Sequence, residues 1–331
     1  MSEDTILAGY PYTWSPSATL SIEEFVTKYK PSMVQNDGTK PWIWARRERD
    51  SKTPSVENEA AAIAEGVTFL QQITARIEEI KDDASIPVRG NKKAGTKSKK
   101  EVREQVHTEA ADKLKDISRK YGYVCGKWLI FVPSDKVDAI WSTIASSLAT
   151  GPLSSTSAFC AKVATSPEDA VPGHRHLICV YIPDVYDKED VTAVMKVLLR
   201  QHGLNLSGVK SDLYTTIGLD SKHPSGIPST VWKNVSLLKD SEIKELKEAY
   251  YTELSVSKAT KTPAANPSKE SKSDVGKSKP LVKKKVAEDP FASDDDTDSK
   301  SGKLASVGGK RKNQESETGG SSNESPVKKK K

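Results

Sequence analysis

The stretch that decides the fold is Lys127-Trp128-Leu129-Ile130-Phe131-Val132, which Pro133-Ser134 follows directly. A short, continuous apolar run that ends in turn residues is typical of a strand in the core of a sheet. Ser134 is a residue type that caps helices, and the apolar residues after it recur at helical spacing. These residues are Val137, Ile140, Trp141, Ile144 and Leu148. The sequence therefore predicts a core strand followed by an amphipathic helix that packs on the sheet.

Similar patterns extend in both directions from this stretch. Ser21 and Glu24 match a capping box that opens a short helix before Pro31. Further helices are predicted over residues 57–80, 102–121, 188–202 (capped by Asp187) and 240–254, and strands over 41–45, 157–164, 176–181, 212–217 and 230–235. Since several strands meet through loops rather than helices, we predict an α+β fold with helices on one face of a mostly antiparallel sheet.

Charge and aromatic content divide the 331-residue chain in two. Residues 257–331 hold 18 basic and 11 acidic residues, a net charge of +7, whereas the chain as a whole carries +6. The same segment has no Trp or Tyr and a single Phe, Phe291. It cannot bury enough apolar surface to offset the entropy of ordering. We therefore predict an irregular arm (residues 1–20), a folded domain (21–254) with a basic loop (86–100), and a disordered tail (255–331).

Composition and motifs exclude several classes of protein. The chain has no apolar run long enough for a transmembrane helix, and its acidic start does not resemble a signal peptide, so no membrane association is expected. Three widely spaced cysteines, Cys125, Cys160 and Cys179, form no disulfide framework and fit a reducing, intracellular compartment. No phosphate-binding glycine loop, zinc-protease motif or nucleophile elbow occurs. We predict that the protein is not an enzyme and needs no cofactor.

The only local histidine cluster is His174 with His176. Alternate positions on a strand could aim both imidazoles to one side, as a metal site needs, but no third ligand is evident nearby. A loop-to-strand junction is the preferred interpretation, and no metal is expected. Cys160 and Cys179 are interpreted as buried thiols. An enzyme that uses the His174/His176 or Cys160 region is the lowest-ranked hypothesis.

Aromatic and basic residues supply the candidate ligand-binding site. Trp42 and Trp44 are two apart on one strand, so they share a face, and Arg46 and Arg47 follow them. The two tryptophans either belong to the core or form a stacking platform for a base, and the arginines either bind phosphate or belong to a mixed charged surface. Trp128 and Trp141 are interpreted as core residues.

Five blocks of sequence, taken in order, resemble the uncharacterised family of the basophilic leukaemia-expressed protein. They are Lys40-Pro41-Trp42-Ile43-Trp44, Gly126 to Pro133, the helix with Val137 and Trp141, Cys160-Ala161-Lys162-Val163, and Ile178-Cys179-Val180-Tyr181. The family is similar in fold to the cap-binding translation initiation factor, so the resemblance implies a curved antiparallel sheet backed by helices. It implies nothing certain about activity, because one fold hosts many functions.

The resemblance also suggests where a cap ligand would bind, and the residues there do not match. Cap recognition uses two Trp rings and a Glu, yet no Trp lies between Ala45 and Lys127. Tyr121 and Tyr123 lie near the second Trp position without a following Glu, and Tyr gives a weaker cation–π attraction. Lys162 and Arg175 lie near the phosphate-binding positions, or on a solvated surface. Ordinary cap binding is therefore not expected.

The tail carries candidate import and modification signals. Two basic clusters resemble a bipartite nuclear import signal, which would engage an import receptor: Lys310, Arg311 and Lys312, and Lys328, Lys329, Lys330 and Lys331. Ser293 precedes three aspartates and Ser325 precedes a proline, as phosphorylation sites do. We expect the protein in the nucleus and the cytoplasm, although a merely solubilising tail would look the same.

The sequence thus favours a non-enzymatic binding protein whose ligand is RNA, or a capped or nucleotide ligand, on the concave face of the sheet with help from the tail. The alternative is a protein-interaction or scaffold module that uses its helical face to bind a protein partner.

Overall fold

The structure is a computed structural model, and it describes residues 9–47, 54–169 and 171–259. All of these residues belong to the first of two units into which the chain divides, Met1–Asp274. No helix among the described residues is long and apolar enough to cross a membrane.

The sheet has six strands in the order β1-β3-β5-β7-β4-β8. Their bounds are β1 (Thr13–Trp14), β3 (Trp42–Arg46), β4 (Gly126–Pro133), β5 (Cys160–Ala164), β7 (Arg175–Ile182) and β8 (Gly208–Ser211). Every neighbouring pair is antiparallel except β1 with β3. A separate parallel pair joins β2 (Gln35–Asn36) to β6 (Ser166–Pro167). The predicted α+β class with a mostly antiparallel sheet is confirmed.

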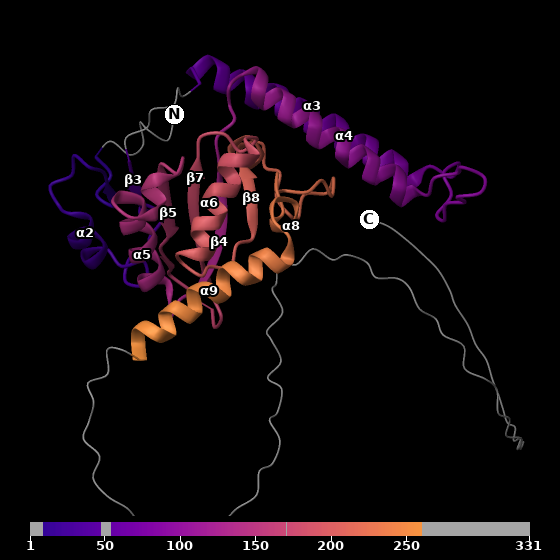
Figure 1. Cartoon of the computed structure of the whole chain (residues 1–331). Helices are drawn as coiled ribbons and strands as arrows, with labels where there is room; N and C mark the ends of the chain where they lie inside the picture. The colour runs from indigo at the N-terminus through magenta and orange to yellow at the C-terminus, as the bar shows by residue number, and fades with distance from the viewer. Residues whose placement is uncertain (1–8, 48–53, 170, 260–331) are drawn as a thin grey trace, which may run out of the picture. The chain divides into compact units, whose positions relative to one another are not determined.

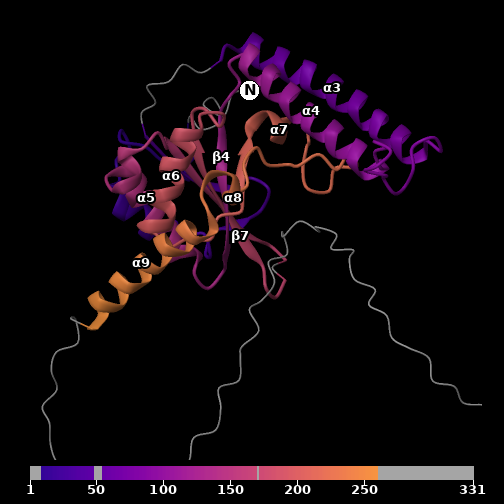
Figure 2. The ribbon, with the colours of Figure 1, turned by 45° about the vertical axis from the view of Figure 1, so that its right-hand side comes forward.

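Helices cover one face of this sheet. α5 (Val137–Ala149) packs directly on β3, β4 and β5, α2 (Ile22–Lys28) packs on α5, and α9 (Asp240–Ala259) packs on α6 (Lys188–Arg200). Figures 1 and 2 show α5 and α6 on the same side of the strands. The residues between the two layers are fully buried, among them Trp128 and Trp141. These two tryptophans therefore belong to the core, as predicted.

A second hydrophobic core lies between α3 (Val56–Asp82), α4 (Lys99–Lys120) and α7 (Asp212–Thr216). α3 and α4 form a long antiparallel hairpin, because each presents buried apolar residues every three or four positions. Gly66 lets α7 approach α3 closely, since a Cβ there would come within 3.2 Å of the Ile217 side chain. Figure 1 shows α3 and α4 side by side along their length.

Most elements predicted from helical caps are confirmed. Ser21 and Glu24 form the capping box of α2, and Asp187 caps α6 by accepting hydrogen bonds from the next backbone amides. Gly122 has a φ of 67°, the left-handed conformation expected just after α4.

Three elements differ from the prediction. Ser134 does not cap α5, which begins at Val137 without a side-chain cap; its hydroxyl instead donates to the carbonyl of His174. Residues 212–217 are not a strand, because Ser211 ends β8 and its hydroxyl caps α7. Residues 230–235 also form no strand: Trp232 makes a single bridge to Val209, and α8 (Asn234–Leu237) follows.

The bounds of three elements differ from the predicted division into arm, domain, loop and tail. β1 lies within the stretch predicted to be an irregular arm, and it pairs with β3 along the sheet edge. α4 begins at Lys99, inside the predicted basic loop, where Ser98 and Glu101 form a capping box. α9 continues past Leu254 to Ala259. The remaining connection, η1 (Pro152–Ser155), is a single 3-10 turn after α5.

Candidate functional site

The face of the sheet opposite α5 and α6 carries the candidate site, and the alternation of side chains along the strands places its residues. Ile43 and Ala45 of β3 face the helices and are fully buried, so Trp42, Trp44 and Arg46 face the other way. In the register of the strands, Trp44 lies opposite Lys162 of β5. α5 packs on β3 and β5 from the other side. We call the side opposite α5 the open face, and its central residues Trp44, Lys162 and Tyr181 are at most 9% exposed.

Lys162 is the centre of an aromatic cluster on the open face. Its Nζ lies 4.4 Å from the ring centroid of Trp42, 4.5 Å from that of Trp44 and 5.4 Å from that of Tyr181. The rings of Trp44 and Tyr181 are stacked, with centroids 6.0 Å apart. An ammonium held over several ring faces is attracted by their quadrupoles. The cluster therefore positions a buried positive charge on an aromatic surface.

Two more lysines extend the positive charge toward β8. Lys127 lies directly opposite Tyr181 on one side and Lys210 on the other. Its Nζ lies 5.3 Å from the Tyr181 ring and 2.7 Å from Oδ1 of Asp212. Burial, and then the charge of Lys127, lowers the pKa of Lys210. Lys210 thus carries its charge at a half-buried position beside Lys127, where an anion would stabilise the charged form.

Two arginines flank this group on the same face. Arg46 occupies the row of Cys160, Tyr181 and Lys127, and it is half-buried. Arg175, at the start of β7, donates from Nη2 to the carbonyl of Phe131 at 2.8 Å. Arg47 lies just beyond β3, where Nη1 donates to the carbonyl of Ala158 at 3.0 Å. Arg47 thus holds the loop that leads into β5 and is a support rather than a member of the open face.

The predicted residues Tyr121 and Tyr123 lie elsewhere. Both pack against the core of the α3–α4 hairpin. The hydroxyl of Tyr121 donates to Glu65 at 2.8 Å, and the hydroxyl of Tyr123 lies 3.2 Å from that of Thr216. Burial raises the pKa of Tyr123. The structure brings Trp42, Trp44 and Lys162 into contact, places Arg46 and Arg175 on the same face toward opposite ends of the strands, and leaves these two tyrosines out.

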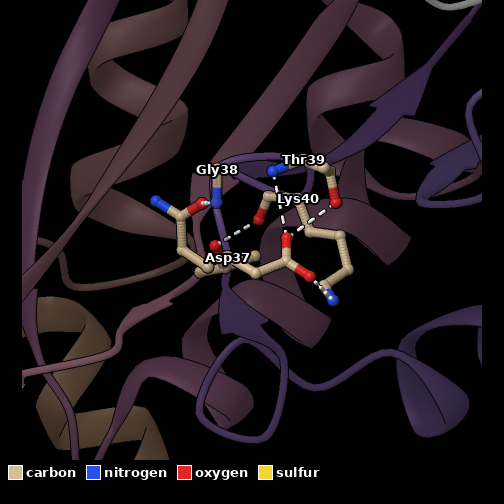
Figure 3. A network of polar contacts seen from close by, with 6 residues as sticks. Asp37, Gly38, Thr39 and Lys40 are labelled. Carbon is tan, nitrogen blue, oxygen red and sulfur yellow. Dashed lines mark hydrogen bonds and ion pairs between the residues drawn. The ribbon is translucent and has the colours of Figure 1, made fainter.

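A polar turn sets the position at which β3 begins (Figure 3). Asp37 accepts hydrogen bonds from both the backbone and the hydroxyl of Thr39, at 3.0 and 2.6 Å, and forms an ion pair with Lys40. The bonds from Lys40 and then Thr39 lower the pKa of Asp37. Gly38 adopts a φ of 87°, which favours glycine. The carbonyl of Lys40 then accepts from the Thr165 hydroxyl at 2.5 Å, so the turn is tied to the end of β5.

The N-terminal arm adds a residue that the sequence did not indicate. Tyr10 packs in the same aromatic cluster, and its hydroxyl donates to the carbonyl of Trp42 at 2.8 Å. Tyr10, Lys127, Tyr181 and Lys210 were all missed as site residues. A signal for Lys127 was present, because it is the one charged residue in an otherwise apolar strand. The other three need the strand pairing to be known.

The histidines form no metal site within the described residues. The rings of His174 and His176 meet edge to face at 4.9 Å, and Nδ1 of His176 bonds to the carbonyl of Ala164 at 2.8 Å. No group of three or more metal-ligating side chains gathers anywhere in the described part of the chain. Cys160 and Cys179 are buried on the open face of β5 and β7.

The predicted signals of the tail lie outside the described residues. They are Ser293, Ser325, Lys310, Arg311, Lys312, Lys328, Lys329, Lys330 and Lys331.

Comparison with known proteins adds a family to this geometry. The family model of the basophilic leukemia-expressed protein Bles03 matches residues 2–215. The match spans the strands and lysines of the open face and the whole α3–α4 hairpin, and it ends within α7. A search of curated proteins finds no match.

Proposed function

The chain belongs to the basophilic leukemia-expressed protein Bles03 family, and we propose that it is a non-enzymatic protein that binds single-stranded RNA or a nucleotide on the open face. The observation that carries the proposal is the group of three lysines, Lys162, Lys127 and Lys210, set among aromatic rings in neighbouring strands. Positive charge set among aromatic rings is the combination with which proteins bind the backbone and the bases of a single strand.

The phosphate groups of the ligand would bind near Lys127 and Lys210. These two residues are opposite one another on adjacent strands, and Asp212 pairs with one of them only. A phosphate between the two ammonium groups would add charge-assisted hydrogen bonds and raise the lowered pKa of Lys210.

The base of the ligand would stack on Trp42. Trp42 is only partly buried, whereas Trp44 is 7% exposed and packs against Tyr181. A base stacked on an exposed ring contributes binding energy with little dependence on its identity. The arrangement does not support recognition of a methylated cap, because Lys162 lies over the rings of Trp42 and Trp44 and would repel a cationic base.

The helical face is a weaker candidate for the site of action. α9 packs on α6 there, and the hydroxyl of Tyr251 ties α9 to the carbonyl of Gly203 at 2.9 Å. Because α9 already covers part of this face, a scaffold role that uses it to bind a protein partner is the alternative rather than the preferred function. In the same proposal, the basic tail assists binding by electrostatic attraction and directs part of the protein to the nucleus.

The proposal is tested with the full-length protein and a fluorescently labelled single-stranded RNA of about ten nucleotides at low salt. Fluorescence anisotropy gives the dissociation constant. We expect Lys210→Gln to raise it about tenfold, as the loss of one charged contact to phosphate does. Lys162→Gln should raise it by about the same factor, because it removes the positive charge beside the Trp42 ring on which the base would stack.

The matched control is Lys244→Gln, which removes the same charge from an exposed position on α9. Every variant keeps the tail, so differences between variants report on the folded part. Equal dissociation constants for the control and the two open-face variants, or no binding by the unaltered protein, would rule out the proposed site.

A further inference from the structure

The turn between α3 and α4 carries a second charged surface, distinct from the open face. Figures 1 and 2 both show it at the end of the hairpin that points away from the sheet. Residues 84–100 contain no acidic residue and no aromatic residue. They contain six cations: Arg89, Lys92, Lys93, Lys97, Lys99 and Lys100. We call residues 84–100 the hairpin tip.

The rest of the α3–α4 hairpin, outside the tip, has a different charge pattern. Its cations are balanced by acids on the same or the facing helix: Arg76 lies 3.7 Å from Glu109, and Lys120 lies 2.7 Å from Glu65. Within the described residues, no ion pair involves Lys92, Lys93 or Lys97. The excess of positive charge is therefore confined to the tip.

The tip is a turn held by defined hydrogen bonds rather than an irregular loop. Asn91 and Thr96 form a β-bridge, with N–H···O distances of 2.8 and 3.1 Å. The side chain of Asn91 accepts from the amides of Lys93 and Ala94, and Gly95 closes the turn with a φ of 68°. Consequently Lys92 and Lys93 extend from a fixed backbone, and both are exposed.

The base of the turn is equally ordered. The carboxylate of Glu101 accepts from the amide and the hydroxyl of Ser98, at 2.8 and 2.9 Å. These bonds, and to a lesser extent the charges of Lys92 and Lys97, lower the pKa of Glu101. Gly90 is required by space, since a Cβ there would lie 2.6 Å from the same carboxylate. Glu101 is thus engaged in capping α4, and Asp83, the acid that precedes the tip, accepts from the amide of Ser85 at 2.7 Å.

We propose that the hairpin tip binds the phosphate backbone of a nucleic-acid duplex. Cations on a rigid turn suit phosphates at fixed spacing, and the small residues between them (Gly, Ala, Ser and Thr) let the backbone approach closely. Proteins that bind single strands use aromatic side chains for stacking, and the tip has none. An anionic membrane fits less well, because Val88 is the one exposed large apolar residue of the tip.

The experiment compares full-length variants on labelled duplex RNA, with duplex DNA of the same sequence as a second arm. The triple variant K92Q/K93Q/K97Q removes three charges from the tip. We expect it to reduce the slope of log affinity against log salt by about 2 to 3 on duplex probes. Tighter binding to RNA than to DNA would identify contacts to the 2′-hydroxyls, and equal binding would identify contacts to phosphate alone; both outcomes support the proposal.

Two controls separate a shaped site from general attraction between opposite charges. K188Q/K196Q/K244Q removes the same charge from α6 and α9, and we expect it to leave the salt slope nearly unchanged. Gly95→Ala keeps every charge but strains the turn, since its φ of 68° disfavours a side chain. We expect Gly95→Ala to weaken duplex binding several-fold while the helices stay folded by circular dichroism.

Three outcomes would overturn the proposal: equal slopes for the two triple variants, unchanged binding by Gly95→Ala, or binding to phosphatidylserine vesicles without binding to duplex. The open-face variant Lys162→Gln, tested on the single-stranded probe, is independent of the tip. Failure of one proposal can therefore be told from failure of the other.

Discussion

The two faces of the six-stranded sheet are made from alternate residues of the same strands, yet their chemistry differs. On the helix side, Trp128 and Ile130 of β4 are at most 1% exposed and belong to the main hydrophobic core. On the open side, the adjacent residues Lys127 and Leu129 lie beside cations, aromatic rings and an aspartate. The helix side therefore contributes to stability through apolar packing, whereas the open side holds charged groups among its aromatic rings.

The first prediction compares two tryptophans of the same sheet. Trp128→Ala should lower the free energy of unfolding by about 3–5 kcal/mol, because it leaves a large cavity between the sheet and its helices. Trp42→Ala should cost about 1–2 kcal/mol, since this ring is only partly buried and its neighbours can relax into solvent. Urea unfolding followed by far-ultraviolet circular dichroism measures both. Equal losses would show that the open face is packed as tightly as the helix face.

The second prediction concerns a buried ion pair of the open face. The side chains of Lys127 and Asp212 are 8% and 14% exposed, so breaking the pair leaves a charge in a poorly solvated place. Asp212→Asn should therefore lower the free energy of unfolding by about 3 kcal/mol.

The matched control is a pair of similar chemistry on the surface. Lys196 and Glu242 are 51% and 43% exposed, and Glu242→Gln should cost at most about 0.5 kcal/mol. A loss of the same size for both variants would mean that water reaches Lys127 freely, and the contrast between the faces would then disappear.

The part of this contrast that could be predicted from the sequence is the local part. Trp42 and Trp44 are two apart, so their common face follows from strand geometry alone, and Arg46 joins them for the same reason. Capping residues and apolar periodicity likewise predict α2, α3, α4 and α6, because a helix satisfies its hydrogen bonds within one segment. These features depend on neighbours along the chain.

The rest depends on which strands lie side by side. Lys162 reaches Trp42, Trp44 and Tyr181 only because β5 pairs with both β3 and β7, and no local pattern encodes that order. The error at residues 212–217 has a similar origin. Leu213, Tyr214 and Ile217 fit one face of a helix, and Ser211 is a good cap, yet their apolar content also suits a strand. The likeness of the fold to the cap-binding factor stays a prediction.

The third prediction has the smallest expected effect and tests a buried polar contact in the helix layer. Nε2 of His202 lies 2.8 Å from Oγ of Ser147, and that oxygen accepts a bond from the amide of Leu153 at 3.1 Å. The Ser147 hydroxyl and Nε2 of His202 thus share a hydrogen bond, in which the tautomer of the imidazole sets the donor. Burial lowers the pKa of His202, so the unfolded chain binds the proton more tightly than the folded chain does.

The sign of the pH dependence follows. Stability should be complete above the unfolded pKa of about 6.5 and should fall as the pH drops below it. His202→Gln keeps an acceptor for Ser147 but does not titrate. Between about pH 7.5 and about pH 5.5, its free energy of unfolding should fall by about 1 kcal/mol less than that of the unaltered protein. A residual slope should remain, because burial also lowers the pKa of His107 and His174. If the two proteins lose stability in parallel, His202 is protonated without penalty, and the helix face tolerates charge as well as the open face does.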